Sequence, residues 1–165
     1  MSEDEFWNLV DGLSPRRATE ELAGRLLLLE PAEIADFQSH FRRANIRAYD
    51  RLLWAAAYII QGGGCSDDAF TDFRSGLISR GRRVFEDALR DPDSLVVVAS
   101  DDPDGFIANE EFGYVAAEVY RKKTGTQMPY DEIPYPSTPL GESWKFSDEQ
   151  LCAMKLPKLW AKFGN

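Results

Sequence analysis

Apolar residues recur every three or four positions along most of this chain, a spacing typical of amphipathic helices around a shared core. The first stripe follows Ser2 and Glu5, which fit a capping box. It consists of Phe6, Leu9, Val10 and Leu13. Ser14-Pro15 then predicts the start of a second helix, Arg16 to Leu29, because serine favours the N-cap and proline the first helical position.

The longest apolar pattern begins at Pro31 and continues to Ile60. Its first part has one apolar face, formed by Ile34, Phe37, Phe41, Ala44 and Ala48. Residues 52–60 are apolar on all sides, which places them at the centre of the fold. One helix of this length is unusual in a globular domain, so we expect a bend between Asn45 and Asp50. Gly62–Gly64 ends the pattern with a flexible turn.

The next pattern predicts two helices joined at Gly81. Ser66 is a good N-cap for the first of them, whose buried stripe is Phe70, Phe73, Leu77 and Ile78. The second, shorter helix reaches Asp91-Pro92. Residues 95–98 are rich in valine and would suit a strand, but the sequence offers no partner strand, so we expect a helix or helical turn there.

The last third of the chain changes character at Thr124, after a helix predicted over Glu110–Lys123. Four prolines within residues 124–146 forbid a helix, and the apolar residues between them indicate an extended strap packed on the helices. Ser147 and Gln150 fit a second capping box, and Pro157 divides the remaining stretch into two short helices. We therefore predict one all-α domain over residues 1–165, with the strap as part of it.

Composition restricts the function without defining it. The 165 residues are 44% hydrophobic and 28% charged, as in an ordinary globular protein. The net charge of −9 argues against nucleic acid and anionic membranes as partners. Two cysteines, an acidic N-terminus and the absence of a long apolar run indicate a cytoplasmic protein without a disulfide framework. We expect no cofactor.

The strongest candidate site follows the glycine turn. Asp67 and Asp68 begin the helix capped by Ser66, with Arg74 two turns later and Arg80 near the end. The guanidinium group of arginine binds carboxylates and phosphates through paired hydrogen bonds, so these residues predict a pocket for a small anion. The strap, which carries Glu142 and Trp144, would cover it as a lid or supply an internal salt-bridge partner. The alternative is that the acids and arginines only complement the two ends of the helix and are solvated.

A candidate calcium loop over residues 100–111 is weaker. With Ser100 as position 1, Asp102 and Asp104 fall at positions 3 and 5 of a calcium loop and Glu111 at position 12. Serine at position 1 and Pro103 at position 4 depart from that pattern, and a polar turn before a helix explains the same residues. We therefore expect no metal.

The thiol of Cys65 lies near a helix N-terminus, which would lower its pKa and make it a nucleophile or ligand contact. A small buried cysteine under a turn is the alternative. His40 is the single histidine and has no catalytic partner at a suitable spacing, so we expect a structural role.

Several segments resemble one family. They are Phe6–Asp11, Leu53–Ile60 followed by Gly63–Asp68, Phe73–Gly81, Ala88–Leu95 and Leu156–Phe163. Together they are similar to the bacterial, largely actinobacterial, family of unknown function numbered four thousand two hundred and forty. The resemblance implies a mainly helical cytoplasmic protein but no activity, cofactor or substrate. Its motif positions include Cys65, Asp67, Asp68 and Arg74, whereas residues 101–109 do not match it.

The leading hypothesis is a non-catalytic binding or regulatory module for a small anionic ligand or an acidic peptide. A small enzyme is the alternative, with Asp67 or Asp68 as general acid or base and Arg74 or Arg80 holding the substrate. A third hypothesis, a protein-interaction module, requires an exposed aromatic patch on the strap or on the helix of Trp160.

Overall fold

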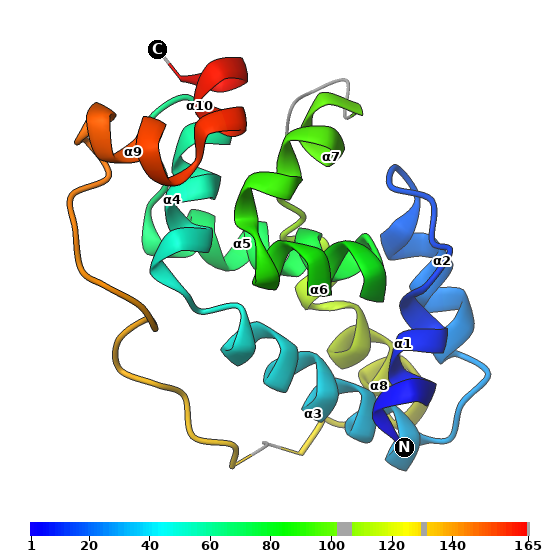
Figure 1. Cartoon of the computed structure of the whole chain (residues 1–165). Coiled ribbons are helices and arrows are strands. Elements are labelled where there is room, and N and C mark those ends of the chain that lie inside the picture. The colour runs from blue at the N-terminus through cyan, green and yellow to red at the C-terminus, as the bar shows by residue number, and fades with distance from the viewer. Residues whose placement is uncertain (102–106, 130–131, 165) are drawn as a thin grey trace.

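The structure, a computed structural model, describes residues 1–101, 107–129 and 132–164, which fold mainly into helices (Figure 1). The α-helices are α1 (Glu3–Val10), α2 (Ala18–Leu26), α3 (Pro31–Arg47), α4 (Arg51–Ile60), α5 (Asp67–Ser79), α6 (Arg82–Arg90), α7 (Leu95–Asp101), α8 (Val115–Thr124), α9 (Glu149–Lys155) and α10 (Pro157–Phe163). Two short 3₁₀ helices, Pro92–Ser94 and Glu111–Gly113, precede α7 and α8. Within the described residues, β-structure is limited to one isolated bridge between Asp50 and Leu140. The expected all-α fold is confirmed.

Helix α5 lies in the middle of the molecule and contacts α3, α4 and α6 (Figure 1). Ser66 caps it, because the Ser66 hydroxyl accepts a hydrogen bond from the backbone N–H of Ala69 at 3.2 Å. The predicted stripe is fully buried and consists of Phe70, Phe73, Leu77 and Ile78. The polar–apolar pattern therefore predicted both the start and the buried face of this helix.

The predicted bend between α3 and α4 is confirmed. Helix α3 ends at Arg47, and α4 begins at Arg51. The Asp50 carboxylate caps α4 by accepting hydrogen bonds from the backbone N–H groups of Leu52 and Leu53, at 2.8 and 3.1 Å. An acid that satisfies the free N–H groups of a new helix stabilises a break at that point.

Gly76 allows the chain to cross α5. A Cβ atom at this position would lie 1.8 Å from the Ile107 carbonyl oxygen, far inside contact distance. The backbone there also donates a hydrogen bond from Asn109 N to the Asp72 carbonyl oxygen at 3.0 Å. Only glycine leaves room for this approach, which fixes where the segment before α8 passes over the core.

The strap (residues 124–146) follows the outer edge of the molecule from α8 to α9 (Figure 1). Beyond Thr124 its described residues form no helix, as the prolines predicted. Arg42 Nε donates to the Ile133 carbonyl oxygen at 3.0 Å, which ties the strap to α3. The backbone of Leu140 bonds to Tyr49 and Arg51 at the junction of α3 and α4. Through Ile133 and Leu140, the described residues of the strap are thus bonded to the helices.

Several predicted helix boundaries were wrong. Helix α2 spans Ala18–Leu26 rather than Arg16 to Leu29, because residues 15–17 form a turn after Ser14 and the helix ends three residues early. The helix expected over Glu110–Lys123 is divided into a 3₁₀ turn and α8. The cap of α9 is Asp148 rather than Ser147, since the Asp148 carboxylate accepts from the backbone N–H of Leu151 at 3.1 Å.

The C-terminal helices α9 and α10 are separated at Pro157, as predicted, and pack on α4. Asp93, which is 4% exposed, caps α10 from another part of the chain. Its carboxylate accepts from the backbone N–H groups of Lys158 and Leu159, at 3.0 and 2.8 Å. None of the helices in the described ranges is long and apolar enough to cross a membrane.

Candidate functional site

The structure separates the residues of the predicted anion pocket. Asp67 and Asp68 are exposed in the first turn of α5. Arg80 is half-buried at the other end of the helix, roughly 20 Å away along its axis. Among the described residues, no ion pair joins either aspartate to Arg74. The acids therefore occupy the positive end of the helix, as the solvated alternative described.

Arg74 lies in the core, with only 2% of its surface exposed. Its guanidinium lies 4.8 Å from the ring centroids of both Tyr49 and Phe70. Nη1 donates to the Asn45 carbonyl oxygen at 3.0 Å and to the hydroxyl of Tyr135 on the strap. All of these groups are neutral, so aromatic faces and oxygen dipoles stabilise the charge in place of a carboxylate.

The remaining donors of Arg74 are largely occupied as well. Nε donates to the Phe70 carbonyl oxygen at 3.3 Å, and Nη2 donates to the Thr71 hydroxyl at 3.0 Å. A guanidinium has five N–H donors, and these bonds use four of them. Arg74 thus joins α3, α5 and the strap. An anion would have to displace Tyr135 or Thr71 to reach it.

Cys65 is half-buried between Trp54 and the start of α5. Burial raises the pKa of its thiol to about 11, and this outweighs the lowering caused by Trp54 and by the charge of Arg74. At neutral pH the thiol is protonated, and a protonated thiol is a poor nucleophile. This geometry matches the alternative of a small residue under a turn.

The strap does not bring Glu142 and Trp144 to Arg74. Glu142 pairs with Lys155 of α9 at 3.4 Å. The Lys155 ammonium also lies 5.8 Å from the centroid of the Trp144 ring. The three residues border a small cavity of about 280 Å³ beside Pro92. The strap residue that covers Arg74 is Tyr135, which the sequence did not single out.

Two named positions of the candidate calcium loop, Ser100 and Glu111, lie in the described residues. Ser100 lies in α7, where its hydroxyl donates to the Val96 carbonyl oxygen at 2.6 Å. Asp102 and Asp104 lie outside the described residues, and Glu111 is exposed at the start of a 3₁₀ turn. His40 is half-buried, and a ring nitrogen lies 2.9 Å from the Met1 carbonyl oxygen. Within the described ranges, no group of three His, Cys, Asp or Glu side chains is placed to hold a metal ion.

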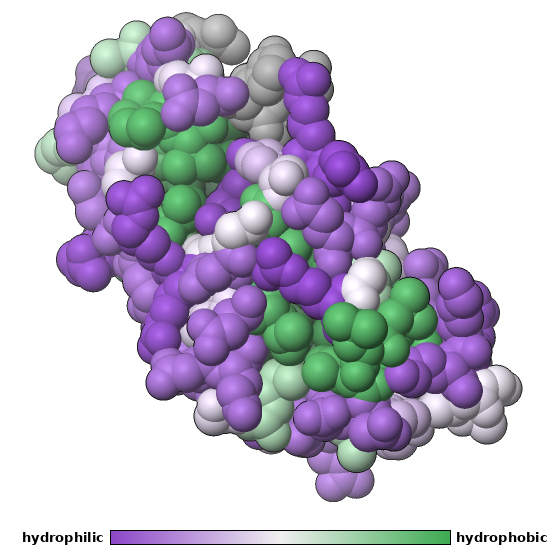
Figure 2. Space-filling view, turned by 90° about the vertical axis from the view of Figure 1, so that its right-hand side faces the viewer, coloured by the Kyte–Doolittle hydropathy of each residue, from purple (hydrophilic) through white to green (hydrophobic). Residues whose placement is uncertain are grey.

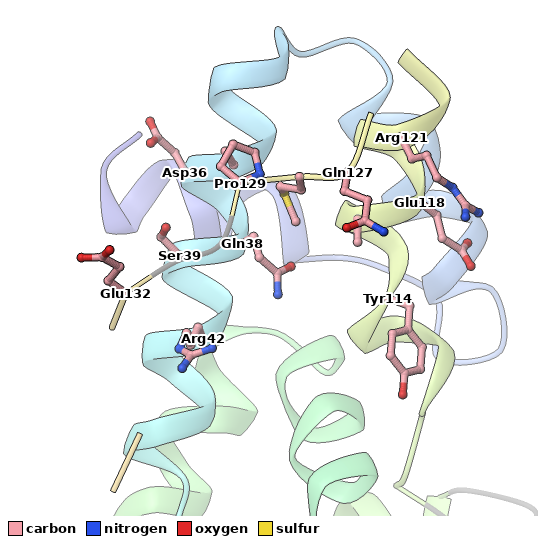
Figure 3. Close-up of a pocket in the computed structure, with 13 residues that line it drawn as sticks. Asp36, Gln38, Ser39, Arg42, Tyr114, Glu118, Arg121, Gln127, Pro129 and Glu132 are labelled. Carbon is pink, nitrogen blue, oxygen red and sulfur yellow. The ribbon is translucent and has the colours of Figure 1, made fainter. Parts of the chain in front are cut away.

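A larger site lies between α3 and α8, which we call the groove (Figure 3). It encloses about 790 Å³. One wall is a stripe of α3 at helical spacing, formed by Ala35, Gln38, Ser39 and Arg42. The other wall is the matching stripe of α8 and the residue before it, formed by Tyr114, Ala117, Glu118 and Arg121. The start of the strap, residues 127–129, crosses between the two helices.

The polar groups inside the groove are available to a ligand. The amides of Gln38 and Gln127 make no hydrogen bond with another described residue and lie in the space between the helices (Figure 3). Ser39 and Tyr114 add hydroxyl groups. Asp36 is already occupied, because its carboxylate pairs with the N-terminal ammonium at 2.7 Å. The groove therefore offers neutral donors and acceptors at its centre and charges at its edges.

Sequence reasoning missed the groove. Two polar stripes with a spacing of three and four residues were visible, at 35–42 and 114–121, but such stripes normally face solvent. Only the packing of α3 against α8 shows that they face each other. Residue types alone gave no signal, because an amide and a hydroxyl are ordinary surface groups.

The fold and groove define an all-α protein with a polar cavity beneath an extended strap. The chain belongs to the family described as "Protein of unknown function (DUF4240)", whose model matches residues 1–122. The search of curated proteins and the search of solved structures found no match. Helices α1 to α7 lie inside the matched range, and α8 crosses its end. The strap, α9 and α10 lie outside it, including the resembling segment 156–163.

Proposed function

We propose that this protein is a non-catalytic binding module of the bacterial cytoplasm, a single domain over residues 1–165, and that the groove takes a small polar ligand. The observation that carries the proposal is the pair of amides without an intramolecular partner, Gln38 and Gln127, inside a cavity of about 790 Å³. Ligand sites of proteins have volumes of this order and contain a few convergent polar groups.

The chemistry of the groove suggests the ligand class. An amide side chain both donates and accepts, so two of them pair well with a carboxamide, a carboxylate or a peptide group. Arg121 is exposed at the edge and has no ion pair with a described residue, so it supports a ligand with an anionic end. Glu118 and Glu132 on the rim favour a second, hydrogen-bond-donating end.

The enzyme hypothesis has less support. Asp67 and Asp68 are exposed and separate from Arg74, whereas a catalytic pair would be close and open on a cavity. The interaction hypothesis has some support from Tyr135 and Leu140 on the strap, which are 44% and 60% exposed. The other large exposed apolar residues of the described ranges lie apart from the strap: Leu27 and Leu28 after α2, Val97 on α7, Tyr114 before α8 and Met154 on α9. Figure 2 shows apolar areas on one side of the molecule that are divided by polar surface.

The test is a titration followed by backbone and side-chain NMR, with glutamine and glycylglycine as probes at millimolar concentration. We expect shifts of the Gln38 and Gln127 side-chain resonances and of the α8 amides. Gln127→Ala should weaken binding about fivefold or more, because it removes one hydrogen-bonding group. Gln150→Ala is the matched control, since Gln150 is exposed on α9. Equal affinities of the two variants would contradict the proposal.

A further inference from the structure

A second cavity, separate from the groove, lies where three helices meet. It encloses about 710 Å³ and is bordered by α1, α3 and α6. Arg43 and Arg47, one helical turn apart, form the wall contributed by α3. Arg82, the first residue of α6, faces them from the other side. We call this cavity the arginine cleft. All of its residues lie inside the range matched by the family model.

The arginine cleft brings three guanidinium groups together in an acidic protein. The chain carries a net charge of −9, yet three guanidinium groups border this one cavity together with two carboxylates, Glu3 and Glu86. The N-terminal ends of α1 and α6 also lie at the cleft, because Glu3 and Arg82 are the first residues of these helices. Acids already offset the partial positive charge of these two helix ends: Glu3, Asp4 and Glu5 lie in the first turn of α1, and Asp11 accepts a hydrogen bond from the Arg82 backbone N–H at 2.7 Å.

Ion pairs hold two of the arginines in position. Arg47 Nη2 donates to both oxygens of Glu86, at 3.0 and 2.9 Å, and its guanidinium lies 5.5 Å from the centroid of the Phe85 ring. Arg82 Nη1 pairs with Asp4 at 2.6 Å. Each guanidinium keeps further N–H donors after these contacts, because it has five. The arginines are therefore oriented before any ligand arrives.

Arg43 is the arginine of the cleft that has no ion pair with a residue in the described ranges, and it is exposed. Arg47 pairs with Glu3 and Glu86, and Arg82 pairs with Asp4. These three acids balance the charge of the three arginines, but none of the pairs occupies Arg43. Trp7 lies at the base of the cleft, 1% exposed, and its Nε1–H has no acceptor among the described residues. The cleft thus combines a guanidinium group without an ion pair and an indole N–H without an acceptor among the described residues.

We propose that the arginine cleft binds a small oxyanion, a carboxylate or phosphate group, through Arg43 with Arg47 and Arg82 beside it. Oxygen atoms of such a group match the fork of a guanidinium. The ligand is small rather than a polyanion, because a chain of phosphates would extend beyond the cleft onto a surface of net negative charge. This inference does not depend on the groove and stands if the groove binds nothing.

The experiment measures binding of inorganic phosphate and of succinate to the full chain by isothermal titration calorimetry and by thermal unfolding at low ionic strength. We expect both anions to raise the unfolding temperature. Arg43→Gln should weaken binding about tenfold. Arg16→Gln is the matched control, because it removes the same charge from an exposed residue that lies before α2 and outside the cleft. Chloride at high concentration should screen the effect.

The affinities of the wild type and the variants for the two anions decide the outcome. A shift in affinity with Arg43→Gln but not with Gln127→Ala supports a separate anion site, with NMR shifts confined to α1, α3 and α6. Equal binding of phosphate by wild type, Arg43→Gln and Arg16→Gln overturns the proposal, because the anion would then bind to net charge alone. The absence of any shift with both anions also overturns it. A difference between phosphate and succinate identifies which oxyanion geometry the arginines accept.

Discussion

Arg74 shows how a single residue can mislead sequence reasoning. Its position in α5 is four residues after Phe70 and three before Leu77, so it lies on the buried stripe of the helix. A charged residue on an apolar stripe is a signal for burial, and that signal was present in the sequence. Its partners were not predictable, because Tyr49, Asn45 and Tyr135 come from other elements.

At this scale we predict that Arg74→Met lowers the free energy of unfolding by about 2 to 3 kcal/mol, the usual cost of losing hydrogen bonds to a charged group. The Asn45 carbonyl, in the last turn of α3, would lose its guanidinium donor. Tyr135→Phe should cost about 1 kcal/mol. Urea unfolding measures both values.

The control for Arg74 is Arg16→Met, because Arg16 is exposed. This change should leave stability within about 0.5 kcal/mol of the wild type. Should Arg74→Met prove as stable as the wild type, Arg74 would be free to serve as a ligand-binding group, as the sequence suggested. A loss of stability with Arg74→Met and Tyr135→Phe, but not with Arg16→Met, supports a structural role for Arg74 and Tyr135.

The elements of the fold were largely predictable. The cap at Ser66, the break at Asp50 and the division at Pro157 each follow from one residue whose local chemistry begins or ends a helix. The error at α9 arose because the adjacent residues Ser147 and Asp148 could both act as caps, and only the hydrogen bonds decide between them. The error at α2 arose because Ser14-Pro15 begins a turn, and the N-cap of the helix is Arg17, which makes no side-chain cap bond. How α3 and α8 pair was not visible, because periodicity defines a face but not its partner.

The crossing at Gly76 gives a prediction for one element. Alanine normally stabilises an exposed helix relative to glycine, and Gly24→Ala in α2, where a Cβ meets nothing within 4 Å, should raise stability by about 0.5 to 1 kcal/mol. Gly76→Ala should have the opposite sign and cost about 3 kcal/mol, because its Cβ would overlap the Ile107 carbonyl.

Urea unfolding of the two glycine variants separates helix propensity from packing. Both values are compared with the wild type under the same conditions. If both Gly24→Ala and Gly76→Ala raised the free energy of unfolding, residues 107–109 would not be in close contact with α5. Opposite signs would establish that this backbone contact, and not the helical tendency of α5, determines which residue position 76 accepts.

At the scale of the whole molecule, the part matched by the family and the part beyond it are joined through Asp93. This residue is 4% exposed, and its carboxylate accepts two backbone N–H groups at the start of α10. The sequence suggested only that Asp93 follows a proline. The role of Asp93 depends on a contact across 65 and 66 positions of the chain, which no local pattern encodes.

We predict that Asp93→Ala costs about 2 kcal/mol of stability, since it removes two hydrogen bonds at a buried helix end. It should also speed the cleavage of the chain by trypsin at Lys158 and Lys162, which lie in α10. Asp148→Ala is the comparison, because Asp148 caps α9 with one bond at an exposed position. A larger loss of stability with Asp148→Ala than with Asp93→Ala would contradict the role of Asp93 in stabilising α10.

The anchors of the strap also set the order in which the chain assembles. Arg42 and Ile133 are 91 positions apart, and closing so long a loop carries an entropic penalty that local contacts cannot offset. We therefore predict that the strap closes after α3, α4 and α5 have met. Before that closure, Arg74 between the rings of Tyr49 and Phe70 would be open to water on the side that Tyr135 covers, so the folding chain would have an accessible guanidinium that the folded protein buries.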